Sequence, residues 1–160
     1  MSSTTLIPNN QVTIFLVGKF NGDKSGNKTF FGFTEAAVAS RISFEALDIT
    51  GTTGFRFWYG TSGFIDSTQS IANNFIISAV KDSNTQYLYM NGALSVSGAN
   101  AQSLTSFSNQ LTVGGYRPQA SALAAKSYIG EVIMFNRALS DFERQQIEQY
   151  LSKKWGIKLA

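Results

Sequence analysis

The stretch Tyr87–Leu94, which reads YLYMNGAL, carries the sharpest structural signal in the chain. Its Asn-Gly pair lies between two runs of alternating polarity, and both residues accept the positive φ that a type I′ turn requires. The sequence therefore predicts a β-hairpin at this point.

Further strands are predicted on both sides of the hairpin, where β-branched and aromatic residues are dense. The predicted ranges are 11–20, 29–33, 41–49, 55–59, 75–82, 110–115 and 128–136. In the first range, apolar side chains alternate onto both faces, with Ile14 on one and Phe15 on the other, so both faces should be covered. Residues 51–54 are expected to form a turn, and residues 98–108 a surface connection.

The chain ends in a pattern of a different kind. Ser140–Glu143 is a capping box, in which the serine hydroxyl and the glutamate each bind a free backbone N–H at the start of a helix. The apolar stripe of this helix is predicted to hold Ile147, Tyr150 and Leu151. Gly156 should end it, and Trp155 should fix its end against the strand at 128–136.

Composition limits the classes of protein to which the chain can belong. A length of 160 residues with 43% hydrophobic residues predicts one globular domain spanning 1–160. The chain has no Cys, which excludes disulfides and thiolate chemistry, and no His, the usual general base and the commonest zinc ligand. The basic residues are scattered around a net charge of +3, which argues against nucleic acid as a partner.

The location of the protein is expected to be extracellular or on a virion surface. No apolar stretch is long enough for insertion into a membrane. The first residues, MSSTTLIPNNQ, lack the basic and apolar regions of a signal peptide. A protein outside the cell would therefore be exported by another route, have had its signal removed, or travel on a virus particle.

The fold class follows from strands in every part of the chain before the last helix. This order favours an all-β fold, in which two antiparallel sheets form a jelly-roll sandwich with one short C-terminal α-helix. The segment Ile129–Arg144 (IGEVIMFNRALSDFER), followed by Tyr150–Leu151 and Lys154–Gly156, resembles the closing segment of laminin G-like, concanavalin A-like domains. The turn Leu88–Gly92 (LYMNG) is also similar to a hairpin of that family, and Leu111–Gly115 lies between the two matches.

Catalysis is not expected. Members of this superfamily that cleave β-glucans carry carboxylates in the pattern E-x-D-x-x-E, which brings them onto one face of a strand. Here Glu45 and Asp48 are three residues apart, and therefore on opposite faces, and no third carboxylate follows. A Ser-His-Asp triad is impossible without His.

Aromatic residues next to arginines predict a face that binds a ligand. If Phe55 and Phe57 point into the core, alternation along 55–59 directs Arg56 and Trp58 away from it. The resemblance of the hairpin to that of the family implies that Leu88 and Met90 point inward, so that Tyr87 and Tyr89 would point outward. Aromatic rings pack against the apolar face of a sugar, and arginine binds its hydroxyl groups. The predicted ligand-binding residues, expected on one exposed sheet face, are Arg56, Trp58, Tyr87, Tyr89, Tyr116 and Arg117.

Two other interpretations of these aromatic residues remain open. Aromatic side chains on strands pack against each other across strands more often than they bind ligands. Such a face could also contact another subunit in a homo-oligomer, because interfaces are enriched in the same residue types. No cofactor is predicted, although calcium could bind at the turns formed by residues 21–27 and 82–84.

The predicted function is therefore that of a non-catalytic, lectin-like module that binds a glycan or a surface polysaccharide. The alternative is a structural virion protein, either a phage capsid decoration or a tail appendage, with capsid or tail proteins as its partners. Fold alone does not choose between these two functions.

Overall fold

The computed structural model describes residues 10–21, 28–34, 41–49, 52–70, 73–104, 111–114 and 126–160. The elements within these residues are β1 (Val12–Phe20), β2 (Lys28–Thr34), β3 (Arg41–Ile49), β4 (Thr52–Gly60), β5 (Gly63–Ser67), β6 (Asn74–Lys81), β7 (Thr85–Met90), β8 (Ala93–Ala99), β9 (Leu111–Val113), β10 (Ser127–Phe135) and α1 (Asp141–Trp155).

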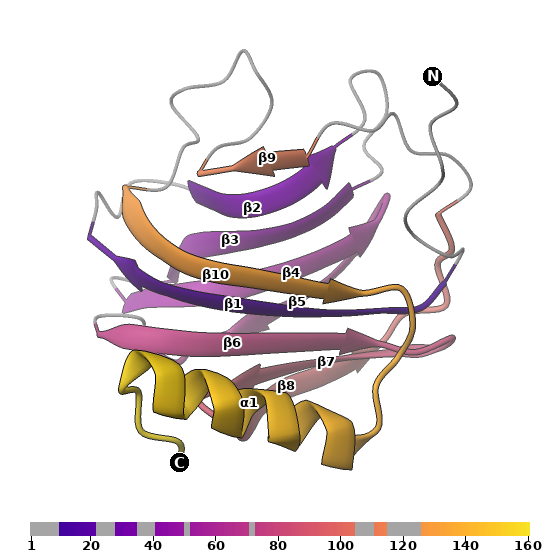
Figure 1. The fold of residues 1–160 in the computed structure, drawn as a ribbon. Coiled ribbons are helices and arrows are strands. Elements are labelled where there is room, and N and C mark those ends of the chain that lie inside the picture. Colours follow the sequence, from indigo (N-terminus) through magenta and orange to yellow (C-terminus); the bar gives the residue numbers. More distant parts are fainter. Residues whose placement is uncertain are drawn as a thin grey trace, which may run out of the picture.

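Two antiparallel five-stranded sheets are stacked face to face (Figure 1). Sheet A has the strand order β10-β1-β6-β7-β8, and sheet B has the order β5-β4-β3-β2-β9. The helix follows the last strand and lies on sheet A. The prediction of an all-β sandwich with one C-terminal α-helix is thus confirmed.

The core between the sheets is rich in phenylalanine. Phe44, Phe55 and Phe57 of sheet B and Phe75 of sheet A are at most 1% exposed. Phe55 lies with its ring centroid 5.4 Å from that of Phe44 and 5.9 Å from that of Phe75, so the rings meet across the two sheets. Burial of each such side chain stabilises the fold by about 1.5–3 kcal/mol.

The predicted hairpin joins β7 to β8. Asn91 has φ of 49° and Gly92 has φ of 89°, as a type I′ turn requires. The Asn91 side-chain oxygen also accepts a hydrogen bond of 2.8 Å from the backbone N–H of Ile76, which ties the turn to the neighbouring strand β6. The prediction for this element is confirmed.

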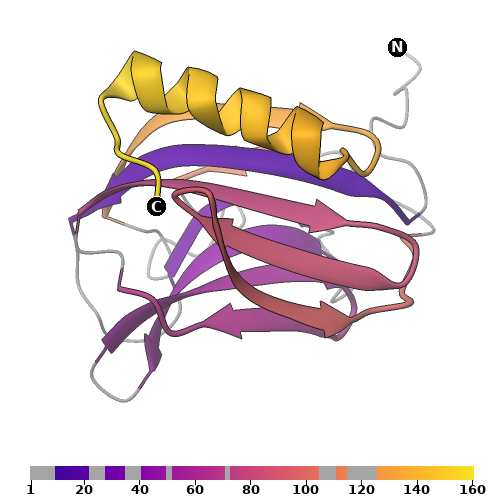
Figure 2. The same ribbon diagram turned by 90° about the horizontal axis from the view of Figure 1, so that it is seen from below.

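Helix α1 begins with the predicted capping box, in which Ser140 and Glu143 bind each other's backbone N–H groups. The helix ends at Gly156, which is left-handed with φ of 65°. Figure 2 shows the helix on the side of sheet A that faces away from sheet B. A second core cluster lies beneath it and includes Phe15, Val17, Ile76, Leu139, Leu151 and Ile157. Both faces of β1 are therefore covered, as expected.

The buried stripe of α1 differs from the predicted one. Tyr150 is 52% exposed, while Arg144 and Glu148 are buried beside Leu151. Arg144 Nη1 donates to Glu148 Oε2 at 2.6 Å, and Ser78 Oγ of β6 donates to Glu148 Oε1 at 2.6 Å. The buried face of α1 thus carries the ion pair Arg144–Glu148 against β6, whereas Tyr150, which the apolar pattern placed on that face, is exposed.

Two predicted element ends need correction, and one strand was missed. Strand β4 begins at Thr52, within the stretch expected to form a turn, and β8 continues to Ala99. Strand β5, Gly63–Ser67, was not predicted. Its five residues are too few to show a clear alternation of apolar and polar side chains. Cross-strand pairing with β4 stabilises it instead.

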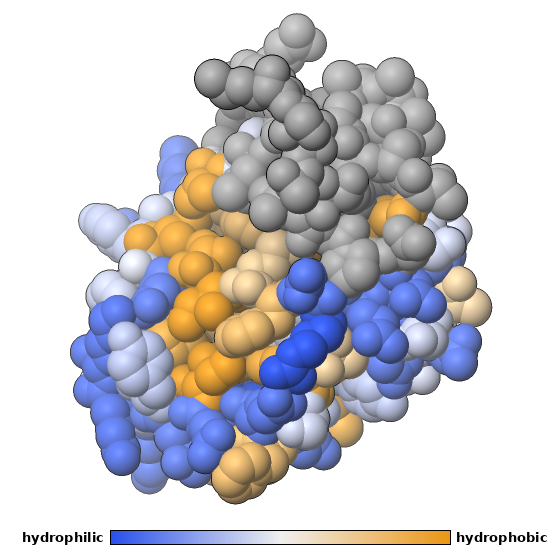
Figure 3. Space-filling model, turned by 45° about the vertical axis from the view of Figure 1, so that its right-hand side comes forward, coloured by the Kyte–Doolittle hydropathy of each residue, from blue (hydrophilic) through white to orange (hydrophobic). Residues whose placement is uncertain are grey.

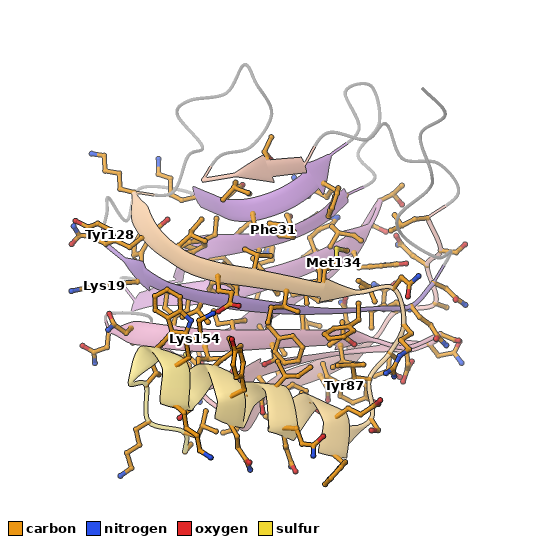
Figure 4. The ribbon with its side chains drawn as sticks, viewed as in Figure 1. Lys19, Phe31, Tyr87, Tyr128, Met134 and Lys154 are labelled. Carbon is orange, nitrogen blue, oxygen red and sulfur yellow. The ribbon has the colours of Figure 1, made fainter. Side chains whose placement is uncertain are left out.

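The two open sides of the sandwich differ. On one side, the Ser67 and Ser95 hydroxyls form a hydrogen bond between β5 and β8. On the other side, a cleft of about 510 Å³ lies between β2 and β10 and is lined by Phe31 and Met134 among others. Figure 4 labels these two side chains, and Figure 3 shows apolar surface exposed in a band on one side of the molecule.

Among the described residues, no helix has the length and apolar character needed to cross a membrane.

Candidate ligand-binding site

Trp58 lies on the outer face of sheet B because β4 alternates strictly. Phe55, Phe57 and Tyr59 are fully buried in the core, so Arg56 and Trp58 between them point outward. The indole N–H of Trp58 donates to the backbone oxygen of Gly60 at 2.8 Å, and this bond fixes the orientation of the ring.

A second aromatic ring lies beside Trp58. Phe64 of β5 is its cross-strand partner, and the two rings stack at 4.9 Å between centroids with an interplanar angle of 20°. Phe64 is 44% exposed, so the pair presents apolar ring surface to solvent. Such a pair is a platform on which the C–H face of a sugar ring can lie.

Two arginines flank the ring pair. The guanidinium carbon of Arg41 lies 3.8 Å from the Trp58 centroid, and that of Arg56 lies 3.9 Å from the Phe64 centroid. Arg56 also binds both carboxylate oxygens of Asp66, at 2.6 and 2.7 Å, and these hydrogen bonds raise the pKa of Arg56. The "Trp58 face" below means Arg41, Arg56, Trp58, Phe64 and Asp66.

A buried carboxylate supports this face from β3. Glu45 is only 2% exposed, accepts a hydrogen bond of 2.8 Å from Ser43 Oγ, and lies 3.6 Å from the Arg41 Nε. It is also the register partner of Arg56. Glu45 therefore holds one arginine in place, and the hydrogen-bond donors and acceptors of the face are arranged before any ligand arrives.

The structure separates the residues that we expected to find on one face. Arg56 and Trp58 lie on the outer face of sheet B, but Tyr87 and Tyr89 lie on the outer face of sheet A, on the opposite side of the sandwich. Tyr89 packs under α1, where the guanidinium carbon of Arg144 lies 3.6 Å from its ring centroid. The expectation of one shared face is therefore wrong for the two tyrosines.

Other predicted site residues lie outside the described part of the chain. Tyr116 and Arg117 belong to this group, and so do residues 22–27 of the turn at 21–27, where calcium could bind. Within the residues that the structure describes, no group of three or more Asp and Glu side chains could hold a metal ion.

Sequence reasoning missed three members of the Trp58 face, namely Arg41, Phe64 and Asp66. Arg41 has the same parity as Glu45 on β3, but the register with β4 that brings it to Trp58 was not available. Phe64 and Asp66 alternate with the buried Ile65, and this short pattern was the only signal for them.

Comparisons with known proteins find the same β-sandwich fold in several solved structures. No protein-family model and no curated protein matches the chain. A carbohydrate-binding module, CBM40, of a Ruminococcus gnavus sialidase, solved with α2,3-sialyllactose, matches 88% of this chain and 84% of its own with a TM-score of 0.65 and 16% identity. Domain 4 of an extracellular arabinanase from Geobacillus stearothermophilus, solved with arabinotriose, matches 90% and 69% with a TM-score of 0.64 and 19% identity.

A larger enzyme contains a similar domain. The leech intramolecular trans-sialidase matches 86% of this chain but only 23% of its own length, with a TM-score of 0.68 and 20% identity. At these identities the matches establish a shared β-sandwich fold.

Proposed function

We propose that this domain is a non-catalytic module that binds a glycan at the Trp58 face. The observation that carries the proposal is the stacked, partly exposed pair of Trp58 and Phe64, flanked by two guanidinium groups and a carboxylate. No helix covers this face in the described part of the chain, since α1 lies on sheet A (Figure 2).

The face offers both kinds of contact that sugars need. The rings supply apolar surface for the C–H groups, and Arg56 with Asp66 supplies a donor and an acceptor for neighbouring hydroxyl groups. Because Arg41 and Arg56 are held by carboxylates, their ordering costs little at binding. Similar sandwiches solved with sialyllactose and arabinotriose support a glycan as the class of ligand.

The test is a glycan array followed by titration of a bound glycan. Trp58→Ala should weaken binding by about tenfold or more, because the stacking surface is lost. Tyr150→Ala is the matched control, since it removes an exposed aromatic ring from α1. Equal binding by both variants, with circular dichroism unchanged, would exclude the Trp58 face.

The location, the family, calcium binding and the oligomeric state of the protein are proposals that follow from the sequence. An extracellular location fits the extracellular arabinanase among the similar structures. The laminin G-like assignment rests on the sequence motifs alone, and the calcium and homo-oligomer predictions stay untested. A role in a virion has no support from the comparisons.

A further inference from the structure

A separate pocket lies on the other side of the molecule, beside the C-terminal end of α1. It has a volume of about 200 Å³ and is bounded by the end of β1, the start of β6, the start of β10 and the tail after the helix. Val17 and Ile157 form its apolar base, and Tyr128 and Trp155 stand at its sides. It belongs to sheet A and shares no residue with the Trp58 face.

Gly130 has no side chain, and this leaves room for the ring of Trp155 at the pocket. The register between β1 and β10 shifts next to Gly130, which is the mark of a β-bulge. A Cβ atom on Gly130 would lie 2.8 Å from the Trp155 ring, so only glycine lets the ring rest on the strand. The indole N–H of Trp155 donates to Glu131 at 2.9 Å, and this bond fixes the ring as one wall.

Three polar side chains align across the mouth of the pocket. Lys19 of β1 is the register partner of Tyr128 on one side and of Asn74 on the other, so all three project from the same face of the sheet. Tyr128 is 66% exposed, and Lys19 and Asn74 are exposed as well. A cation, an amide and a phenol are therefore presented above an apolar base.

Among the described residues that line the pocket, Lys19 carries a positive charge. Within the described residues no carboxylate pairs with Lys19, and Glu131, the acid next to the pocket, is already bound by Lys154 at 2.9 Å. Figure 4 shows Lys19, Tyr128 and Lys154 together at the end where β1 and α1 finish. An anionic group on a ligand would therefore find an ammonium group that no described carboxylate binds.

We infer that this pocket is a second ligand site, which takes one carboxylated sugar ring. The aromatic walls would contact the C–H face of the ring, and Lys19 would bind its carboxylate, with Asn74 and the Tyr128 hydroxyl within reach of hydroxyl groups. The volume is below the range of about 300–1,000 Å³ typical of larger ligands, which suits a single ring of a longer anionic chain. The site does not depend on the Trp58 face.

The chain has two tryptophans, which makes the two faces separable by fluorescence. In a Trp58→Phe protein, Trp155 alone reports on the pocket. Trigalacturonic acid should change its emission saturably, whereas neutral galactotriose should not. Added to that protein, Tyr128→Ala should weaken the affinity about tenfold, and Lys19→Gln about two- to fivefold. Tyr150→Ala, on the same helix as Trp155, should leave it unchanged.

Three outcomes would overturn the inference: no saturable change with trigalacturonic acid, an equal response to galactotriose, or affinity unchanged by both pocket variants. The reciprocal Trp155→Phe protein reports on Trp58. Its response to a glycan found by the array tests the Trp58 face separately, so failure of one site is distinguishable from failure of the other.

Discussion

At the scale of the residue, Gly130 and Trp155 depend on each other. The glycine leaves the space that the indole ring fills, and Glu131 then binds the indole N–H. Lys154 donates a hydrogen bond to the same carboxylate and lowers the pKa of Glu131. The end of α1 is thus held to β10 by one ring and one shared carboxylate.

Gly130→Ala should lower the free energy of unfolding by about 1–3 kcal/mol, because the new Cβ displaces the Trp155 ring. In a Trp155→Ala background, the same change should be neutral or stabilising by about 0.5 kcal/mol, since alanine restricts the unfolded chain. Urea denaturation of the four proteins measures both values. An equal cost in the two backgrounds would show that the ring is not the cause.

At the scale of the element, the ends and the buried face of α1 use charge in different ways. At its start, Glu143 is partly exposed to solvent and binds Arg137 as well as the cap residue Ser140. In the middle, Arg144 and Glu148 are buried against β6 and β7. We therefore expect the contribution of Glu143 to stability to depend on pH. The contribution of the buried Arg144–Glu148 pair should be lost when either residue is replaced.

Arg137 and the cap lower the pKa of Glu143 from its ordinary 4.5 to about 2. A carboxylate with a lowered folded pKa stabilises the fold above its unfolded pKa, and this contribution is lost as the pH falls through the folded value. Glu143→Gln should therefore lower Tm at pH 7, and the difference should disappear between about pH 4.5 and pH 2. Thermal melts across this range test the prediction, which a difference independent of pH would contradict.

Glu148→Ala should cost about 3–5 kcal/mol, because it leaves the buried Arg144 with the exposed Asp141, 3.4 Å away, in place of its buried partner. The double variant Arg144→Met/Glu148→Leu should cost much less, since no uncompensated charge remains. Gln149→Ala, at an exposed neighbouring position, is the control. Chemical denaturation would refute this account if the double variant were the least stable of the set.

At the scale of the whole molecule, one core joins the two sheets. Residues of both sheets, such as Phe55 and Phe75, belong to the same buried cluster, and α1 covers the outer side of sheet A through a second cluster. Neither sheet can keep its inner face buried without the other. We therefore expect the sandwich and its helix to unfold together.

The two tryptophans report on opposite sides of this structure. Trp58 lies on sheet B and Trp155 at the end of the helix on sheet A. Single-tryptophan proteins made by Trp58→Phe and Trp155→Phe should each show one urea transition that coincides with the loss of their own far-UV circular dichroism signal. If the Trp155 signal changed at lower urea than the circular dichroism, the helix would be a separate unit.

Much of the fold is predictable because its signals are local. Asn91 and Gly92 need positive φ, and Ser140 and Glu143 close a capping box within four residues, so the hairpin and the helix start follow from the sequence. Alternation also determined that Trp58 points away from the core. The stripe of α1 was predicted less well, because apolar spacing does not reveal a buried ion pair.

The sequence by itself determined the hairpin, the capped helix, the described strands other than β5, and the outward direction of Trp58. Only the tertiary structure decided which strands become neighbours, and so which outward side chains meet. Trp58 gained Phe64 and Arg41 from strands beside it, while Tyr87 and Tyr89 went to the opposite sheet. The physical reason is that side-chain direction follows from the local period of two, whereas sheet membership depends on hydrogen bonds between segments far apart in the chain.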